Sequence, residues 1–315
     1  MRSGSSSQCR RSGAGPAGGR QTQDGQCDRG GGPGRLTIVS LGPGFLQYLV
    51  PAALDALNSA DVLVGYKMYL DLIGDLIAGK KTLASGMRKE VERCNLAIDQ
   101  ALAGNRVALV SSGDAGIYGM AGLVFDLCRE RNLRIERSEL VGLHFDSNAD
   151  PAQEERGGGL DLWIDVVPGV PAFNAASAVL GAPLMHDFAA VSLSDHLTPW
   201  ELIEKRLTAV ATADFVLAIY NPRSKTRPHG LQRAVDLLLQ HRPATTPVGI
   251  VGRAMRDGQW STVTTLGEIP FADVDMQSMV IVGNSRTYLW QGWMVTPRGY
   301  LDKYTLEGEP ASAEE

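Results

Sequence analysis

The loop at residues 111–121 constrains the fold of this chain more than any other segment. The apolar run at residues 107–110 stops abruptly, and a glycine-rich stretch with a single carboxylate, Asp114, follows it. Apolar residues then recur three and four positions apart, which predicts a helix over residues 117–128. A strand that ends in such a loop offers backbone groups at the carboxyl edge of a sheet, where α/β proteins bind ligands. The segment therefore predicts an α/β fold with a ligand site at this loop, although an ordinary strand-to-helix turn gives the same pattern.

Length, composition and charge exclude several classes of protein. The 315 residues, 44% hydrophobic and 21% charged, are typical of a globular protein with one large or two medium domains. Residues 1–35 carry +4, which leaves −9 on the rest of the chain because the net charge is −5. An acidic body disfavours nucleic-acid binding. No apolar run reaches the ~18 residues that span a bilayer, and the first residues lack the apolar core of a signal peptide, so we expect a cytoplasmic protein without a membrane segment.

The cysteines and histidines do not predict a metal site. Cys9, Cys27, Cys94 and Cys128 form no C-x-x-C pair, and the five histidines are scattered along the chain. Free thiols in a reducing compartment are the expected state.

The pattern along the chain predicts two α/β domains with a ligand cleft between them. Residues 1–34 are rich in Gly, Ser, Arg and Gln and are expected to be a disordered leader. An N-terminal domain over residues 35–169 is expected to have a mainly parallel sheet and to contain a flexible insertion at residues 138–159. A C-terminal domain over residues 170–302 is expected to have a mixed sheet, and an acidic tail follows at residues 303–315.

Periodicity and turn residues place the individual elements. Strands are expected at residues 36–41, 62–64, 107–110, 163–167, 189–193, 215–219, 248–251, 260–266 and 279–282. Further helices are expected at residues 51–57, 69–77, 89–102, 172–180, 198–210 and 229–240. Gly104 is the expected C-terminal cap of the helix at 89–102. Thr198, Pro199 and Glu201 fit a capping box at the start of the next-to-last helix. The last three strands have little helix between them, so part of the second sheet should be antiparallel.

Several strands end in loops of unusual composition, which predicts a ligand site built mainly from backbone. These loops are Gly42-Pro43-Gly44, Gly113-Asp114, the turn at 168–171, Tyr220-Asn221-Pro222-Arg223, Gly252-Arg253-Ala254 and Gly283-Asn284-Ser285.

A dinucleotide site is disfavoured, although Gly42-Pro43-Gly44 follows the first strand. Gln47 stands where the third glycine of G-x-G-x-x-G belongs, and Pro43 removes an amide that could bind pyrophosphate. The chain also lacks a G-x-x-x-x-G-K-[S/T] loop, a G-x-S-x-G elbow and an H-E-x-x-H pair.

Two kinds of side chain are candidates for chemistry. His186 beside Asp187 and His196 beside Asp195 could carry protons, or could be hydrogen-bonded loop residues. The cations that follow two strands could clamp substrate carboxylates or form exposed basic loops. These cations are Arg223, Lys225, Arg227, Arg253 and Arg256.

Taken together, these segments resemble the tetrapyrrole methyltransferases. The motifs that carry the resemblance are L-G-P-G at 41–44, V-G-Y at 64–66, the loop at 111–121, V-P-G-V at 167–170, G-A-P-L-M-H-D at 181–187, S-L-S-D at 192–195, L-T-P-W-E at 197–201, Y-N-P-R-S-K at 220–225 and V-T-P-R-G-Y at 295–300. The match covers nearly all of residues 36–300. It is most specific, through Y-N-P-R-S-K and L-T-P-W-E, for the branch that methylates carbon 17 of precorrin-3B in cobalamin synthesis.

The resemblance implies a two-domain homodimer that binds S-adenosylmethionine, without a metal, beside an anionic tetrapyrrole. The residues it implies for the methyl donor are Gly113, Asp114, Ile117, Pro171, Ala172, Tyr220, Asn221, Arg253 and Ala254. The tetrapyrrole is expected over the loop of Gly42, Pro43 and Gly44, with Arg223 and Lys225 as its carboxylate clamp. Two departures are visible: Ala115 replaces a frequent proline, and Pro171 replaces a usual Ser or Thr.

The implied reaction is methylation of carbon 17 with ring contraction, which converts precorrin-3B to precorrin-4. Asp195 and His196 are the candidates for the proton transfers that ring contraction needs. Two alternatives stay open: the corresponding enzyme that acts on a cobalt-loaded substrate, and a non-catalytic tetrapyrrole carrier.

Overall fold

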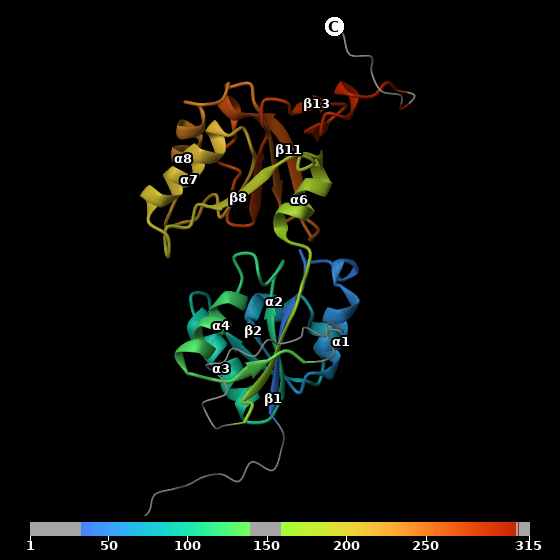
Figure 1. Cartoon of the computed structure of the whole chain (residues 1–315), viewed down its shortest axis with the longest axis vertical. Coiled ribbons are helices and arrows are strands. Elements are labelled where there is room, and N and C mark those ends of the chain that lie inside the picture. Colours follow the sequence, from blue (N-terminus) through green and yellow to red (C-terminus); the bar gives the residue numbers. More distant parts are fainter. Residues whose placement is uncertain (1–32, 139–158, 307, 309–315) are drawn as a thin grey trace, which may run out of the picture. The chain divides into compact units, whose positions relative to one another are not determined.

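The computed structural model describes residues 33–138, 159–306 and 308. The described residues form one compact unit, and many of its elements are labelled in Figure 1. Most of the expected leader, insertion and acidic tail lie outside the described residues. The domain division at residue 169 stays a prediction. No helix in the described part of the chain is long and apolar enough to cross a membrane.

The first sheet has six strands, all of them paired in parallel, as expected. Its order is β3 (Lys81–Ser85), β2 (Val62–Tyr66), β4 (Arg106–Ser111), β1 (Gly34–Ser40), β6 (Leu162–Val167) and β5 (Ile135–Glu136). The two outermost strands, β3 and β5, were not predicted. They lie at the sheet edges and are largely exposed, so their sequences lack the apolar runs of the central strands.

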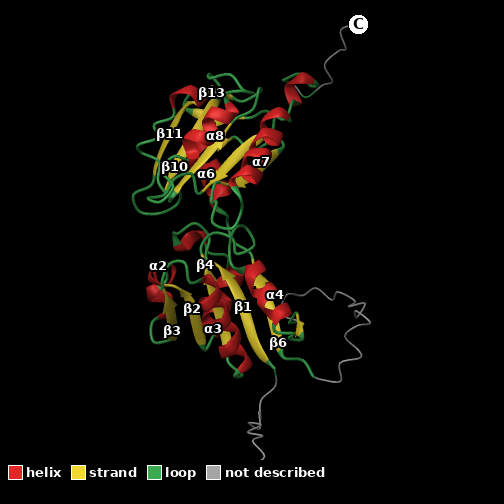
Figure 2. Cartoon of the chain, turned by 90° about the vertical axis from the view of Figure 1, so that its left-hand side faces the viewer, coloured by secondary structure: helices red, strands yellow, loops and turns green. Residues whose placement is uncertain are grey.

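Helices cover both faces of this sheet because the strand side chains alternate. On β1, Leu36 and Ile38 join one buried cluster, which α3 (Glu90–Leu102) and α4 (Ala121–Glu130) complete, while Val39 joins a second cluster with α1 (Pro51–Ser59). The strands of this sheet are drawn side by side in Figure 2, with α3 and α4 labelled beside them. The remaining helices here are η1 (Leu46–Tyr48), α2 (Lys67–Asp71) and η2 (Gly74–Ile77).

Three sequence-based expectations for the helices need correction. The single helix expected at residues 69–77 is two short ones, α2 and η2, with Gly74 opening the second. The helix expected from residue 117 begins at Ala121, because Tyr118 has a left-handed backbone (φ 53°) that no helix accommodates. The capping box does not form: Pro199, which has no side-chain acceptor, is the N-cap of α7 (Trp200–Thr212).

The expected cap of α3 is confirmed. Gly104 adopts φ 89° just beyond the helix, its N–H donates to the Ala101 carbonyl, and the Asn105 N–H donates to the Gln100 carbonyl. This pair of bonds is a Schellman motif, which requires the left-handed conformation that glycine adopts without strain.

The second sheet has five strands and is mixed, as expected. Its order is β11 (Trp260–Thr265), β10 (Pro247–Gly252), β12 (Ser278–Val282), β9 (Val216–Tyr220) and β8 (Phe188–Ser192); only β8 and β9 pair in parallel. A smaller sheet joins β13 (Tyr288–Trp290), β14 (Trp293–Val295) and β7 (Gly181–Ala182). Short 3-10 turns lie at η4 (Leu266–Glu268) and η5 (Tyr300–Asp302).

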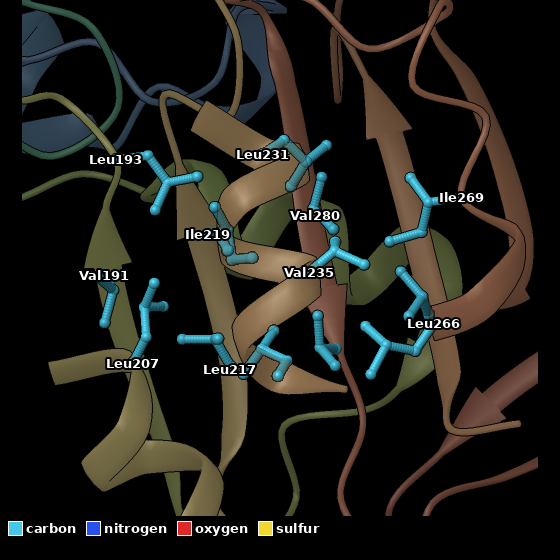
Figure 3. Close-up of a cluster of buried hydrophobic side chains, with 14 of the residues drawn as sticks. Val191, Leu193, Leu207, Leu217, Ile219, Leu231, Val235, Leu266, Ile269 and Val280 are labelled. Atoms are coloured by element: carbon cyan, nitrogen blue, oxygen red, sulfur yellow. The ribbon is translucent and has the colours of Figure 1, made fainter. Parts of the chain in front are cut away.

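The second sheet also buries an apolar cluster on each face. On one face, side chains of α7 and α8 (Gly230–Leu238) pack on the strands; Figure 3 shows Leu207, Val235 and Ile219 meeting there. On the other face, α6 (Ala172–Leu180) packs through Phe173 and Leu180. The helix α6 directly follows β6, so it carries the chain from the first sheet to the second.

An exposed ion pair between Asp61 and Arg106 gives a pH-dependent prediction. The Asp61 carboxylate lies 2.6 Å from Nη2 of Arg106 and also accepts that residue's backbone N–H. The hydrogen bonds from Arg106 lower the pKa of Asp61 from 3.8 to about 2. A carboxyl group whose pKa is depressed in the folded state stabilises the fold above its unfolded pKa and loses that effect as the pH falls toward the folded pKa.

Asp61→Asn is therefore expected to lower the urea midpoint slightly at pH 7, by a small amount because the pair is exposed. The difference from the wild type should shrink as the pH falls below about 4. Urea unfolding from pH 7 to pH 3 measures it, with Asp55→Asn on the exposed face of α1 as the control. A difference that grows on acidification would contradict this prediction.

Candidate functional site

Two glycine-containing loops of the first sheet are joined by their backbones. The Gly42 N–H donates to the Gly113 carbonyl at 3.0 Å, and the Gly113 N–H donates to the Gly42 carbonyl at 2.8 Å. Both residues have left-handed φ angles, 70° and 66°. The structure thus brings the loop predicted to bind substrate directly against the loop predicted to bind the methyl donor.

The Asp114 carboxylate fixes the second of these loops. Its Oδ1 accepts the Gly116 N–H at 2.7 Å, and its Oδ2 accepts the Gly169 N–H at 3.0 Å. The buried Ser40 hydroxyl accepts the next amide of the loop, that of Ala115, at 2.9 Å. Asp114 therefore connects the end of β4 to the turn after β6, and so to the start of α6.

Only glycine fits at position 169. A Cβ there would lie 2.5 Å from the Gly113 carbonyl oxygen and 2.6 Å from Cβ of Ser40. The close packing of three strand ends therefore depends on the missing side chain.

Four residues predicted to contact the donor pack on one apolar cluster. Ile117, Ala172, Tyr220 and Ala254 come from four separate segments, and all are partly buried against the cluster around Phe173. Their partly exposed side chains form an apolar surface, and the backbone N–H and C=O groups of the loops lie beside it. Such a surface suits the flat, weakly polar part of a ligand, with the loop amides and carbonyls for its polar groups.

Tyr220 stands where this surface meets the start of α6. Its hydroxyl accepts the Phe173 N–H at 3.4 Å, and its ring centroid lies 4.8 Å from that of Tyr118. The Tyr118 hydroxyl in turn donates to the Ala190 carbonyl at 3.0 Å. Burial raises the pKa of Tyr220 to about 12, so this hydroxyl is neutral at physiological pH.

Backbone strain is concentrated in the same loops. Among the described residues, eight non-glycine residues have positive φ, and four of them lie here: Tyr118, Asn221, Arg253 and Met255. Side chains hold two of these turns, because Nδ2 of Asn221 donates to Ser192 Oγ and Nε of Arg253 donates to Gln277 Oε1. Strain of this kind costs about 1–3 kcal/mol per residue and is typical of functional sites.

Comparison with known proteins identifies the family. Residues 35–137 and 151–270 match the family model described as Tetrapyrrole (Corrin/Porphyrin) Methylases. The chain belongs to the tetrapyrrole methylases. The resemblance drawn from the sequence motifs is therefore confirmed.

Three proteins that the chain matches are covered over nearly their whole length. A Salmonella typhimurium protein described as a probable cobalt-factor III C(17)-methyltransferase is 45% identical over 265 residues, which cover 84% of this chain and 99% of that protein. A Sinorhizobium precorrin-3B C(17)-methyltransferase is 37% identical over 273 residues, 85% of this chain and 97% of that one. The crystal structure of the methyltransferase CobJ aligns with a TM-score of 0.71 and 34% identity, covering 84% of this chain and all of that one. The expected fold class is thus confirmed.

In this tetrapyrrole methylase, two of the arginines that could clamp carboxylates, Arg223 and Arg227, already have carbonyl partners. Nη1 of Arg223 donates to the carbonyls of Phe271 and Ala272, at 2.6 and 3.2 Å, while Lys225 is exposed. Nη1 of Arg227 donates to the Leu193 carbonyl at 2.9 Å. The clamp stays a prediction, and it would use the guanidinium nitrogens of Arg223 that these carbonyls do not engage.

Two of the predicted proton carriers, Asp195 and His196, lie in the loop after β8, and His186 lies just before that strand. Asp195 is 3.6 Å from Nε of Arg227, and both Asp195 and His196 are exposed. His186 is also exposed, with Nδ1 accepting the Asp187 N–H at 2.8 Å. A role in proton transfer stays a prediction for each. Among the described residues, no group of three or more His, Cys, Asp and Glu side chains could hold a metal ion.

Sequence reasoning missed Ser40, and it named Gly169 and Arg256 without the contacts through which they assemble the site. Ser40 ends β1, Gly169 opens the turn after β6, and Arg256 reaches the first-sheet loops from the loop after β10. Ser40 left a weak signal, because it is a buried polar residue at the end of an apolar strand. The packing of Gly169 and the reach of Arg256 involve residues distant in the sequence, which no local pattern reveals.

Proposed function

We propose that this chain transfers a methyl group from S-adenosylmethionine to carbon 17 of a trimethylated tetrapyrrole in cobalamin synthesis, with ring contraction. The observation that carries this proposal is the Asp114 carboxylate, which accepts the Gly116 N–H within the loop after β4 and the Gly169 N–H of the turn after β6, while the Gly42 loop pairs with Gly113. Relatives named for C(17) methylation support this choice over other tetrapyrrole methylations.

The residues present fit the donor chemically. Ile117, Ala172, Tyr220 and Ala254 offer apolar surface for an adenosyl group. The carboxylate of Asp114 and the carbonyls of the loops offer negative charge near a sulfonium. Gly113 lies close to the start of α6, since a Cβ there would be in van der Waals contact with Ala172 N and Pro171 Cα, at 3.8 and 3.9 Å.

The protein's contribution to the reaction is to place the methyl donor and the acceptor carbon relative to each other. S-adenosylmethionine supplies a methyl group on positive sulfur, and the sulfur keeps the electron pair of the C–S bond when a ring carbon attacks. Loops fixed by Asp114 and by backbone pairing hold the reactants in line, which gives a high effective concentration. The Tyr220 hydroxyl accepts an N–H group from the first turn of α6 and so helps to orient that turn. Because its pKa is raised to about 12, it stays neutral and adds no negative charge to the site.

We propose two candidate substrates, the first precorrin-3B and the second its cobalt-loaded counterpart. The 45% identity to a protein named for cobalt-factor III favours the second, and the 37% identity to a precorrin-3B enzyme supports the first. Pro43 and Gly44 are proposed to face the macrocycle, Arg223 and Lys225 to bind its carboxylates, and Asp195 or His196 to move the ring-contraction proton. A cytoplasmic homodimer remains our expectation.

Incubation with methyl-labelled S-adenosylmethionine and either trimethylated substrate tests the proposal. We expect one labelled methyl group in the product, found by mass spectrometry, and conversion of one substrate well above the other. Calorimetry should show binding of S-adenosylhomocysteine and none of NAD. A chain that binds the tetrapyrrole but transfers no methyl to either form would be a carrier, and the proposal would fail.

A further inference from the structure

Arg256 connects three loops that lie far apart in the sequence. It follows Arg253 and Ala254 in the loop after β10, and its guanidinium is partly buried. Nε donates to the Pro43 carbonyl, and Nη2 donates to the Ser112 hydroxyl at 2.6 Å. Pro43 belongs to the proposed acceptor loop, and Ser112 directly precedes Gly113 and Asp114 of the proposed donor loop.

Backbone hydrogen bonds around Arg256 hold its loop against the loop of residues 42–45. Its N–H donates to the Arg253 carbonyl at 3.0 Å, which closes the strained turn that contains Met255. The Met255 carbonyl accepts the Phe45 N–H at 2.9 Å, so main chain and side chain meet the acceptor loop together. A Cβ on Gly44 would lie 2.3 Å from Cγ of Arg256, and the glycine therefore leaves the path open for the side chain.

We infer that Arg256 is a positioning residue that sets the acceptor loop against the donor loop, so that the tetrapyrrole carbon lies in line with the methyl group. The inference rests on the proposed function. A charge-assisted bond to each loop fixes their separation, and the planar fork of arginine fixes the angle as well. Lysine has one nitrogen and cannot hold both partners in the same geometry.

The inference predicts that loss of Arg256 lowers kcat/KM for the tetrapyrrole much more than it weakens binding of the methyl donor. In Arg256→Ala, kcat/KM for the tetrapyrrole should fall by about 10-fold to 100-fold, because a misplacement near 1 Å can cost that much. The Kd of S-adenosylhomocysteine, measured by calorimetry without tetrapyrrole, should change by less than about 3-fold, because the Arg256 side chain bonds to Pro43 and Ser112 and not to the residues proposed for the donor, and its backbone bond to Arg253 is kept in the variant. Arg256→Lys should fall between the wild type and Arg256→Ala.

Arg129→Ala is the matched control, since this arginine is exposed on α4 and, among the described residues, its side chain pairs with its helix neighbours Asp126 and Glu130 at the surface. Its kinetics should equal those of the wild type. Equal losses in S-adenosylhomocysteine binding and in kcat/KM for Arg256→Ala would show a merely structural role, and unchanged kcat/KM would show none. Either result would overturn the inference.

A double-mutant cycle keeps the test decisive if Arg256→Ala unfolds. Ser112→Ala removes one partner, and in the Arg256→Lys background it should cost less in kcat/KM than in the wild type. Additive losses would mean that Ser112 and Arg256 act independently, against the inference. Failure of the wild type to methylate would instead count against the proposed function.

Discussion

Gly169→Ala is expected to separate the strand ends that form the site. The new methyl group would lie 2.5 Å from the Gly113 carbonyl oxygen and 2.6 Å from Ser40 Cβ, and backbone atoms cannot give way cheaply. Overpacking of this kind costs about 1–3 kcal/mol of stability. Because the Gly169 N–H is also a partner of Asp114, we expect the affinity for S-adenosylhomocysteine to fall at least about 10-fold.

Urea unfolding and calorimetry measure the two effects of this substitution. Gly122→Ala, near the start of α4, is the control, since a Cβ there meets no atom within 4 Å. It should leave ligand binding unchanged and stabilise the fold by up to about 1 kcal/mol, because alanine is the better helix former. Normal binding by Gly169→Ala would show that the strand ends tolerate separation, against our account of the site.

Asp114→Ala is expected to give the second large loss. Two backbone amides, those of Gly116 and Gly169, would lose a carboxylate acceptor, and bonds to charged groups contribute about 1.5–3 kcal/mol each. About half of that total, about 1.5–3 kcal/mol, is expected to act on the bound geometry, so the Kd of S-adenosylhomocysteine should rise by about 10-fold to 150-fold. Asp114→Asn keeps one acceptor oxygen and should lose less.

The control for this second substitution is Asp126→Ala, because that carboxylate is exposed on α4 beside Arg129. It should bind S-adenosylhomocysteine like the wild type. An Asp114→Ala variant with a lower unfolding midpoint but unchanged affinity would assign the carboxylate to folding alone.

Much of the fold could be predicted because its signals are local. The apolar runs of β1, β4 and β9 and the spacing of α3 and α6 placed these elements within a few residues of their observed bounds. The edge strands β3 and β5 escaped prediction, since exposed strands need no apolar run. The start of α4 was also wrong, because the left-handed Tyr118 is held by a hydrogen bond to Ala190, 72 positions away.

The sequence by itself determined the central strands of the two larger sheets, the glycine loops at their ends and the family to which those loops belong. Hydrophobic periodicity and turn-forming residues act over a few positions, so the elements that they specify can be predicted from a single sequence. Only the tertiary structure decided which loops touch: Arg256 reaches Ser112 across 144 positions and Pro43 across 213. Such contacts depend on how packed sheets and helices bring distant loops together, and no local pattern encodes that distance.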